Sequence, residues 1–213
     1  MKSITLTLAE YKLVPVVTLD EPQKANLLAD AFKTNGLPLI EVTLRTDAAL
    51  ESIRRIRESH PDMRIGAGTV LKVDQVRAAR EAGADFIVSP GFNPAIVDHC
   101  TDRNIPIVPG VDSPTLIEAA LERGIQLVKF FPAQVSGGVE YLKAAAAPYN
   151  EIQFMPTGGI NPGNILNYLA LKKVVACGGS WLAPRELLAG DDFDEIGRRT
   201  REALGLIREN TRA

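Results

Sequence analysis

Eight short apolar runs, each followed by a longer amphipathic stretch, constrain the fold of this chain more than any other feature. The runs recur roughly every 20–26 residues, the length of one strand, one helix and two short loops. They cover residues 13–19, 38–44, 63–67, 85–89, 105–109, 126–131, 152–157 and 174–178. The pattern predicts eight consecutive βα units, preceded by a short helix at about 5–12 and followed by a charged amphipathic helix over 193–208.

Proline and glycine mark the expected helix boundaries. Proline suits the first helical turn, where its missing N–H needs no partner, and glycine suits the residue after a helix. The expected starts are Asn93-Pro94, Ser113-Pro114 and Asn161-Pro162, and the expected ends are Gly36, Gly83 and Gly124.

Two α/β architectures accommodate eight such units, a closed parallel barrel and an open doubly wound sheet. The open sheet is expected to carry a glycine-rich nucleotide loop after its first strand, but residues 17–22 contain no glycine. A length of 213 residues suits one domain and lies within the range of compact barrels. No linker or low-complexity tract divides the chain. We therefore predict an α/β protein with a single compact (β/α)8 TIM-barrel domain over residues 1–213.

Charge and hydropathy argue against several classes of partner. The formal net charge is −2 and no basic block occurs, so the electrostatic footprint of a nucleic-acid-binding protein is missing. No apolar stretch approaches the length of a membrane span, and the first ten residues lack the apolar core of a signal peptide. Cys100 and Cys177 are isolated and form no CxxC. Free thiols of this kind are typical of a reducing compartment, so we expect a cytoplasmic protein.

The second apolar run places polar side chains inside the predicted barrel. Strand side chains alternate between the two faces of a sheet. Over residues 39–45 the even positions are aliphatic and suit contact with helices, so Glu41, Thr43 and Arg45 are expected to point inward. An inward glutamate and arginine are costly unless they are paired or take part in chemistry. A structural ion pair is the alternative to a catalytic role.

The sixth run places a lysine in the same interior. The alternation over residues 126–131 turns Lys129 and Phe131 inward. In one interpretation, the ammonium of Lys129 neutralises Glu41 and has no other role. In the other, the apolar surroundings disfavour the charged form, and the neutral amine attacks a keto carbon to form a Schiff base.

Two glycine pairs lie near the ends of the last two runs. They are Gly158-Gly159 and Gly178-Gly179, and Ser180 follows the second pair. Loops after the seventh and eighth strands form the recurrent phosphate site of this barrel, where glycine lets backbone N–H groups approach and helix N-termini add a positive dipole. Two ordinary tight turns are the alternative.

Six segments, in order along nearly the whole chain, resemble the class I aldolase family that contains 2-keto-3-deoxy-6-phosphogluconate (KDPG) aldolase and 4-hydroxy-2-oxoglutarate (KHG) aldolase. The segments are EVTLRT at 41–46, GAGTVL at 66–71, SPG at 89–91, KFFPA at 129–133, PTGGI at 156–160 and GGSWL at 178–182. Gln134 is a departure, because an acidic residue, or a polar residue other than glutamine, often occupies this position in the family.

The resemblance implies a homotrimeric barrel enzyme that needs no metal and no cofactor. By position in the motifs, Lys129 matches the Schiff-base lysine and Glu41 the carboxylate that shuttles protons. The remaining matches are to substrate contacts. Arg45 and Thr69 match positions that hold the carboxylate region, Pro90 and Phe131 the pocket wall, Thr157 the substrate hydroxyls, and Gly158, Gly159, Gly179 and Ser180 the phosphate cradle.

These matches predict a lyase that cleaves KDPG to pyruvate and glyceraldehyde 3-phosphate, as in the Entner–Doudoroff pathway. The same chemistry on 2-keto-3-deoxy-6-phosphogalactonate or on KHG remains open. A phosphosugar isomerase or epimerase on the same barrel and a non-catalytic binding protein are more remote alternatives. A metal-dependent aldolase would need a cluster of ligands, and the only histidines are His60 and His99.

Overall fold

The structure is a computed structural model that describes residues 3–210. Strands and helices alternate along it, as the eight apolar runs predict. The strands are β1 Leu13–Val17, β2 Leu39–Thr43, β3 Arg64–Gly68, β4 Phe86–Val88, β5 Ile107–Val108, β6 Gly110–Val111, β7 Leu127–Phe130, β8 Gln153–Phe154 and β9 Cys177–Gly179. The helices are α1 Ile4–Tyr11, α2 Ala25–Thr34, α3 Ala49–Ser59, α4 Val73–Glu81, α5 Pro94–Thr101, α6 Pro114–Leu121, α7 Gly138–Ala146, α8 Ile165–Leu169, α9 Arg185–Ala189 and α10 Phe193–Asn210, with a 3-10 turn over Pro22–Lys24.

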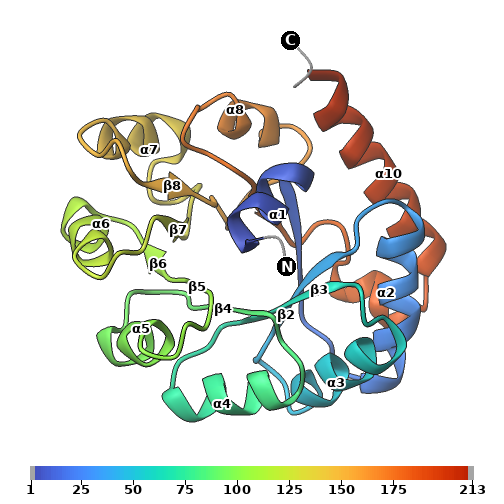
Figure 1. The fold of residues 1–213 in the computed structure, drawn as a ribbon. Coiled ribbons are helices and arrows are strands. Elements are labelled where there is room, and N and C mark those ends of the chain that lie inside the picture. Colours follow the sequence, from blue (N-terminus) through green and yellow to red (C-terminus); the bar gives the residue numbers. More distant parts are fainter. Residues whose placement is uncertain (1–2, 211–213) are drawn as a thin grey trace.

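The strands form curled parallel sheets with helices outside them. One sheet has the order β5-β4-β3-β2-β1-β9 and the other the order β6-β7-β8, and every strand pair in both is parallel. Single bridges join Phe154 to Val174 and Thr157 to Gly178, between β8 and the segment that leads through β9. Figure 1 shows the strands around the centre and most of the helices in an outer layer. The α/β class is confirmed.

The fifth predicted strand is divided at Pro109. Its first part, β5, pairs with β4, whereas β6, which lies beyond the predicted run, pairs with β7. Pro109 has no N–H to donate to a ladder, but its carbonyl accepts a hydrogen bond from Lys129 N at 2.8 Å. The chain therefore changes its pairing partner at this residue, and the predicted strand appears as two short elements.

Most of the predicted helix boundaries are confirmed. Asn93 caps α5 by accepting from Ala95 N at 3.1 Å, with Pro94 in the first turn. Pro114 likewise starts α6, and the three glycines predicted to end helices all have positive φ, where glycine avoids a steric penalty. The prediction at Asn161-Pro162 is wrong. The Asn161 side chain accepts from Gly163 N at 2.8 Å in a turn, and α8 begins only at Ile165.

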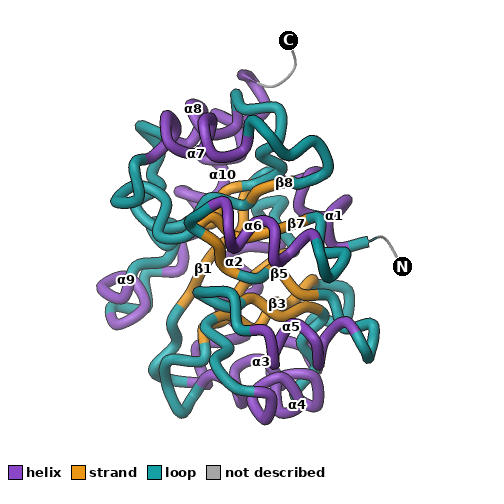
Figure 2. The backbone as a smooth tube through the Cα atoms, turned by 90° about the vertical axis from the view of Figure 1, so that its left-hand side faces the viewer, coloured by secondary structure: helices purple, strands orange, loops and turns teal. Residues whose placement is uncertain are grey.

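The two ends of the strand layer differ, and this places the site. The predicted N-terminal helix is α1, which directly precedes β1 and therefore lies at the amino ends of the parallel strands. Helix α9 follows β9 and lies at their carboxyl ends. Figure 2 shows α1 and α9 on opposite sides of the strands. Because α1 covers one end, the opposite end is where the strand-to-helix loops can form a site.

Glycines on β3 leave room for larger side chains inside the strand layer. An ideal Cβ on Gly66 would lie 2.4 Å from the Phe86 ring, and one on Gly68 would lie 2.2 Å from Glu41 Oε1. The interior is therefore filled by side chains that cross from neighbouring strands. No helix within residues 3–210 is long and apolar enough to cross a membrane.

Candidate active site

A cavity of about 240 Å³ opens at the carboxyl ends of the strands. It gathers side chains and glycines from segments that are far apart in the sequence. The residues that line it are Val16, Glu41, Thr43, Arg45, Lys129, Phe131, Thr157, Gly158, Gly159, Ile160, Gly178 and Ser180. Eight of the eleven predicted site residues are in this set, so the sequence motifs do converge on one place.

Lys129 and Glu41 form a buried ion pair on the floor of this cavity. Lys129 Nζ donates to Glu41 Oε1 at 3.1 Å, and the two side chains are 7% and 0% exposed. Lys129 Nζ also lies 5.3 Å from the centre of the Phe131 ring. The second carboxylate oxygen, Glu41 Oε2, is buried and has no hydrogen-bond partner in the described part of the chain. The amine therefore stands beside a carboxylate that can still accept a proton or a hydrogen bond.

The predicted alternation of β2 and β7 is confirmed by what the opposite faces contact. Phe130 packs outward on Tyr141 of α7, with ring centres 6.0 Å apart and planes at 17°. Val42 is fully buried and does not line the cavity. Lys129 and Glu41 consequently point the other way, into the cavity, because successive side chains of a strand alternate.

Arg45 lies at the mouth and not in the interior. Its side chain is exposed, and its Nε donates to Thr69 Oγ1 at 3.2 Å. The sequence left open whether Glu41 pairs with Arg45 or takes part in chemistry. In the structure the partner of Glu41 is Lys129. Thr69 itself has φ of 56°, a costly backbone conformation for a β-branched residue and one that is enriched at functional sites.

The two glycine pairs meet at one edge of the cavity. Gly158 and Gly159 have φ of 99° and 79°, so a side chain at either position would be strained. The bridge between Thr157 and Gly178 brings the two loops together, and the exposed Ser180 lies on the same rim. Helix dipoles do not contribute as predicted, because neither pair leads directly into a helix: α8 begins at Ile165 and α9 at Arg185.

Gln134 supports the first glycine loop from outside the cavity. Its backbone N donates to Gly158 O at 3.0 Å, and an ideal Cβ on Gly159 would lie 2.5 Å from the Gln134 Cβ. Its amide oxygen accepts from the Tyr168 hydroxyl at 3.0 Å. Burial is the main cause that raises the pKa of Tyr168, so this hydroxyl keeps its proton. This departure from the family pattern therefore packs on the loop.

Three predicted residues lie beside the cavity and not on its wall. Thr69 reaches it through Arg45. Pro90 follows β4, and its carbonyl is so close to β6 that an ideal Cβ on Gly110 would lie 2.1 Å from it. Gly179 faces the Trp181 ring, which would lie 1.9 Å from an added Cβ. The roles of all three remain predictions.

Some residues that line the cavity have no role in the sequence predictions, although Thr43 and Ile160 lie within the matched segments. Val16 and Ile160 line the cavity with apolar surface, and Thr43 lines it between Glu41 and Arg45. Strand alternation predicted the direction of Thr43 but gave it no role. No local pattern in the first apolar run singles out Val16.

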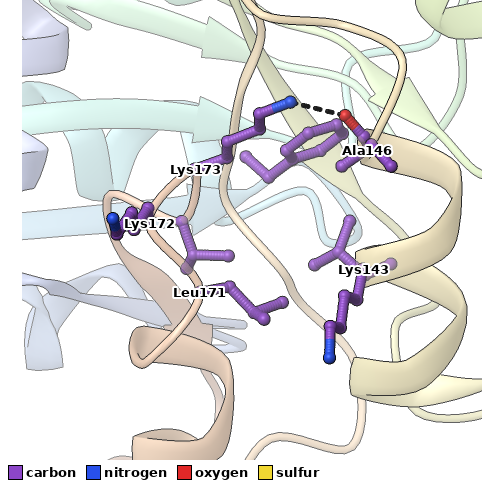
Figure 3. Close-up of a pocket in the computed structure, with 9 residues that line it drawn as sticks. Lys143, Ala146, Leu171, Lys172 and Lys173 are labelled. Carbon is purple, nitrogen blue, oxygen red and sulfur yellow. Dashed lines mark hydrogen bonds between the residues drawn. The ribbon is translucent and has the colours of Figure 1, made fainter.

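A second pocket, of about 190 Å³, lies between α7 and the segment that leads into β9 and contains no comparable chemistry. Leu142, Leu171 and Phe154 are among the residues that line it. Its most enclosed amine, Lys173 Nζ, donates to the carbonyls of Ala146 and Tyr149 at 2.6 and 2.5 Å (Figure 3). This lysine therefore caps α7, whereas Lys129 is paired with an acid.

The two histidines lie away from the cavity. His60 ends α3, and its Nε2 lies 2.9 Å from Asp30 Oδ1. His99 belongs to α5, where burial is the main cause that lowers its pKa. Across residues 3–210 no three His, Cys, Asp or Glu side chains gather in a way that could hold a metal ion.

Comparison with known families agrees with this geometry. The sequence profile of the KDPG and KHG aldolase family matches residues 4–199 of the 213 in the chain. The chain belongs to this aldolase family. The match covers every segment that contributes to the cavity, from Val16 to Ser180.

Individual relatives of this aldolase are similar over nearly their full lengths. The aldolase is 51% identical to the 2-dehydro-3-deoxy-phosphogluconate aldolase of Haemophilus influenzae, over 94% of this chain and 95% of that protein. A Legionella pneumophila KDPG aldolase, with pyruvate captured at low pH as a covalent carbinolamine, superposes with a TM-score of 0.92 at 34% identity, covering 95% and 98% of the chains. A Zymomonas mobilis KDPG aldolase with 3-phosphoglycerate has a TM-score of 0.90 at 35% identity, covering 97% of each.

Proposed function

We propose that this aldolase cleaves 2-keto-3-deoxy-6-phosphogluconate to pyruvate and glyceraldehyde 3-phosphate through a Schiff base on Lys129. The observation that carries the proposal is the buried contact of 3.1 Å between Lys129 Nζ and Glu41 Oε1 inside the cavity. A buried amine that serves only as a counter-ion has no need of a cavity. The cavity gives a keto acid access to this one.

In the first half of the reaction, the neutral amine of Lys129 attacks the C2 ketone and forms a carbinolamine. Glu41 supplies and accepts the protons needed to expel water, which leaves an iminium. The pair in the structure suits this start, since proton transfer from Lys129 Nζ to Glu41 Oε1 gives the amine in its nucleophilic form.

In the second half, the iminium acts as an electron sink. Glu41 removes the proton of the C4 hydroxyl, the C3–C4 bond breaks, and its electron pair moves into an enamine as glyceraldehyde 3-phosphate leaves. Protonation of the enamine and hydrolysis release pyruvate and restore the amine. A well-placed base of this kind contributes on the order of 10²–10⁴-fold to the rate.

The remaining cavity residues would orient the substrate. Arg45 and Thr69, joined by their hydrogen bond, would hold the carboxylate at the mouth. The loops of Gly158 and Gly159 and of Gly179 and Ser180 would hold the phosphate. Phe131 would form the apolar wall, with Pro90 beside the cavity, and Thr157 would face the substrate hydroxyls.

We also propose a closed (β/α)8 TIM barrel that forms one domain over residues 1–213. Two features support closure: the chain continues through Pro109 from β5 into β6, and single bridges link β8 to the segment that leads through β9. Counting β5 and β6 as one strand gives the predicted eight.

From the family resemblance we expect a cytoplasmic homotrimer that needs no cofactor or metal. Sedimentation equilibrium tests the trimer, and full activity in excess EDTA tests the absence of a metal.

Pyruvate release, coupled to lactate dehydrogenase, tests the proposed reaction. We expect Lys129→Ala to abolish release and Lys172→Ala, an exposed lysine beside the second pocket, to leave it unchanged. KDPG, its galactonate epimer and KHG should be compared by kcat/KM, because discrimination resides in that ratio. A higher kcat/KM for either of the other two compounds would reassign the substrate, and pyruvate release by the Lys129→Ala variant would remove the Schiff base from the account.

A further inference from the structure

Thr18 and Thr43 form a hydroxyl pair at the edge of the cavity. Their Oγ1 atoms are 2.8 Å apart. The pair follows from strand register, because Val17 of β1 is paired with Val42 of β2 and the next residue of each strand is a threonine. Thr43 lines the cavity and is 1% exposed, whereas Thr18 does not line it. The Thr43 hydroxyl therefore belongs to the site, and Thr18, outside the cavity, holds it by a hydrogen bond.

Either hydroxyl can be the donor in this pair, and one of the two protons is left over. Each threonine hydroxyl has one proton to donate and two lone pairs that accept. Within residues 3–210 the only hydrogen-bond partner of either hydroxyl is the other one. When Thr18 donates to Thr43, the proton of Thr43 is left to point into the cavity. A buried donor without a partner is costly, so a ligand atom that accepts from Thr43 gains this interaction.

The position of Thr43 selects a part of the substrate. Thr43 is the last residue of β2 and lies on the same face as Glu41, about 6.6 Å farther along the strand. Arg45 follows two residues later, in the turn after the strand. On its other side β1 pairs with β9, with Pro15 beside Gly179. The hydroxyl pair thus lies between the residues assigned to the carboxylate and the loops assigned to the phosphate. A sugar-acid chain that spans these two ends passes Thr43 with its hydroxyl-bearing carbons.

We propose that Thr43 donates a hydrogen bond to the C4 oxygen of the substrate and that Thr18 sets the direction of this proton. The inference rests on the proposed function and deepens it, since it names a determinant of C4 configuration. The C4 oxygen accepts from Thr43 while its own proton goes to Glu41, two residues away on the same face. Only one configuration at C4 places that oxygen between the two side chains. Thr43 contacts the substrate, and Thr18 is a positioning residue.

Isosteric variants test the proposal. Thr43→Val removes the donor and is expected to lower kcat/KM for the preferred C4 epimer by about three- to tenfold, the range for one neutral hydrogen bond. The other epimer is expected to change little, so the ratio between the two shrinks, whereas Thr43→Ser keeps the ratio. Thr200→Val is the matched control, because Thr200 is fully buried and donates to Ile196 O at 2.8 Å in α10, away from the cavity.

Thr18→Val tests the positioning role and also serves if Thr43→Val fails to fold. We expect a smaller loss in the same direction, about threefold. Because Thr18 acts only through Thr43, the double variant is expected to match Thr43→Val alone. Losses that multiply in the double variant, or equal losses for both epimers, would overturn the proposal.

Trapping with borohydride separates this inference from the proposed function. Pyruvate has no C4, so its reduced adduct on Lys129 is expected to form at the wild-type rate in every threonine variant. Slower trapping in Thr43→Val would place the hydroxyl at the pyruvate half and contradict the inference. If the wild-type protein itself forms no pyruvate adduct, the proposed function fails, independently of either threonine.

Discussion

The substitution Gly68→Ala adds one methyl group and is expected to disable the site, although it leaves the chemical identity of Lys129 and Glu41 unchanged. An ideal Cβ at this position lies 2.2 Å from Glu41 Oε1 and 2.8 Å from its Cγ. Ordinary contacts begin at 3.4 Å, so the carboxylate must retreat by about 1 Å. The hydrogen bond to Lys129 Nζ is already 3.1 Å long, so a shift of this size away from the amine takes it beyond useful range.

The expected cost in activity follows from this displacement. Misplacing a reacting group by about 1 Å can cost on the order of 10²-fold, and complete loss of a general base costs up to about 10⁴-fold. We therefore expect Gly68→Ala to lower kcat for pyruvate release by on the order of 10²-fold. The assay is pyruvate release at saturating KDPG, with circular dichroism to confirm that the fold is retained.

Two further variants bracket the result. Gly205→Ala is the matched control, since nothing lies within 4 Å of its added Cβ and α10 contributes no residue to the cavity. Glu41→Gln keeps the shape of the side chain and removes the base, so it is expected to lose at least as much activity as Gly68→Ala. A folded Gly68→Ala enzyme with wild-type kcat would show that the place of the Glu41 carboxylate does not limit the reaction, and the reasoning would be refuted.

Three other predictions concern the rest of the fold. Gly205→Ala should raise stability by about 0.5–1 kcal/mol, because glycine inside a helix costs that much relative to alanine, and urea unfolding measures this gain. Burial raises the pKa of the Cys100 thiol to about 11 and also raises that of Cys177, so neither thiol should react with a disulfide reagent at pH 8 until the protein is unfolded. Hydrogen bonds from Arg198 and Arg199 lower the pKa of Glu195 from 4.5 to about 2. Stability from this group is present above pH 4.5 and lost as the pH falls toward 2, and Glu195→Gln should remove that part of the acid dependence of Tm.

The direction of the side chains inside the site was predictable from the two-residue alternation of the strands. Alternation along β2 and β7 is enough to turn Glu41 and Lys129 inward, and the apolar even positions fix which face is which. Alternation does not identify the partner of Glu41, because Arg45 and Lys129 are both basic and only their heights along the strands distinguish them. The structure places Arg45 at the mouth.

Contacts between strands were beyond reach of the same reasoning. The pair of Thr18 and Thr43 depends on the register of β1 against β2, which no local pattern encodes. The space that Gly68 leaves for Glu41 depends likewise on the register of β2 against β3. No local pattern near the end of β3 indicates that the Glu41 side chain occupies this space.

Local chemistry misled at two boundaries. Asn161-Pro162 has the composition of a helix start, but Gly163 follows at once, and the Asn161 side chain bonds to its N–H in a turn. Turn-forming residues that continue through Asn164 were the available signal against an early helix. Pro109 divides the fifth strand for a different reason. It has no N–H to donate to a ladder, and the chain changes its pairing partner from β4 to β7 at this residue.

The central claim is that one buried amine, Lys129, forms the covalent bond to the substrate, and chemical trapping tests it most directly. The protein is incubated with pyruvate, reduced with borohydride, digested and mapped by mass spectrometry. The account predicts one pyruvyl adduct per chain, on the peptide that contains Lys129, and none in Lys129→Ala. A protein that gains no mass, or gains it on another lysine, would contradict the account.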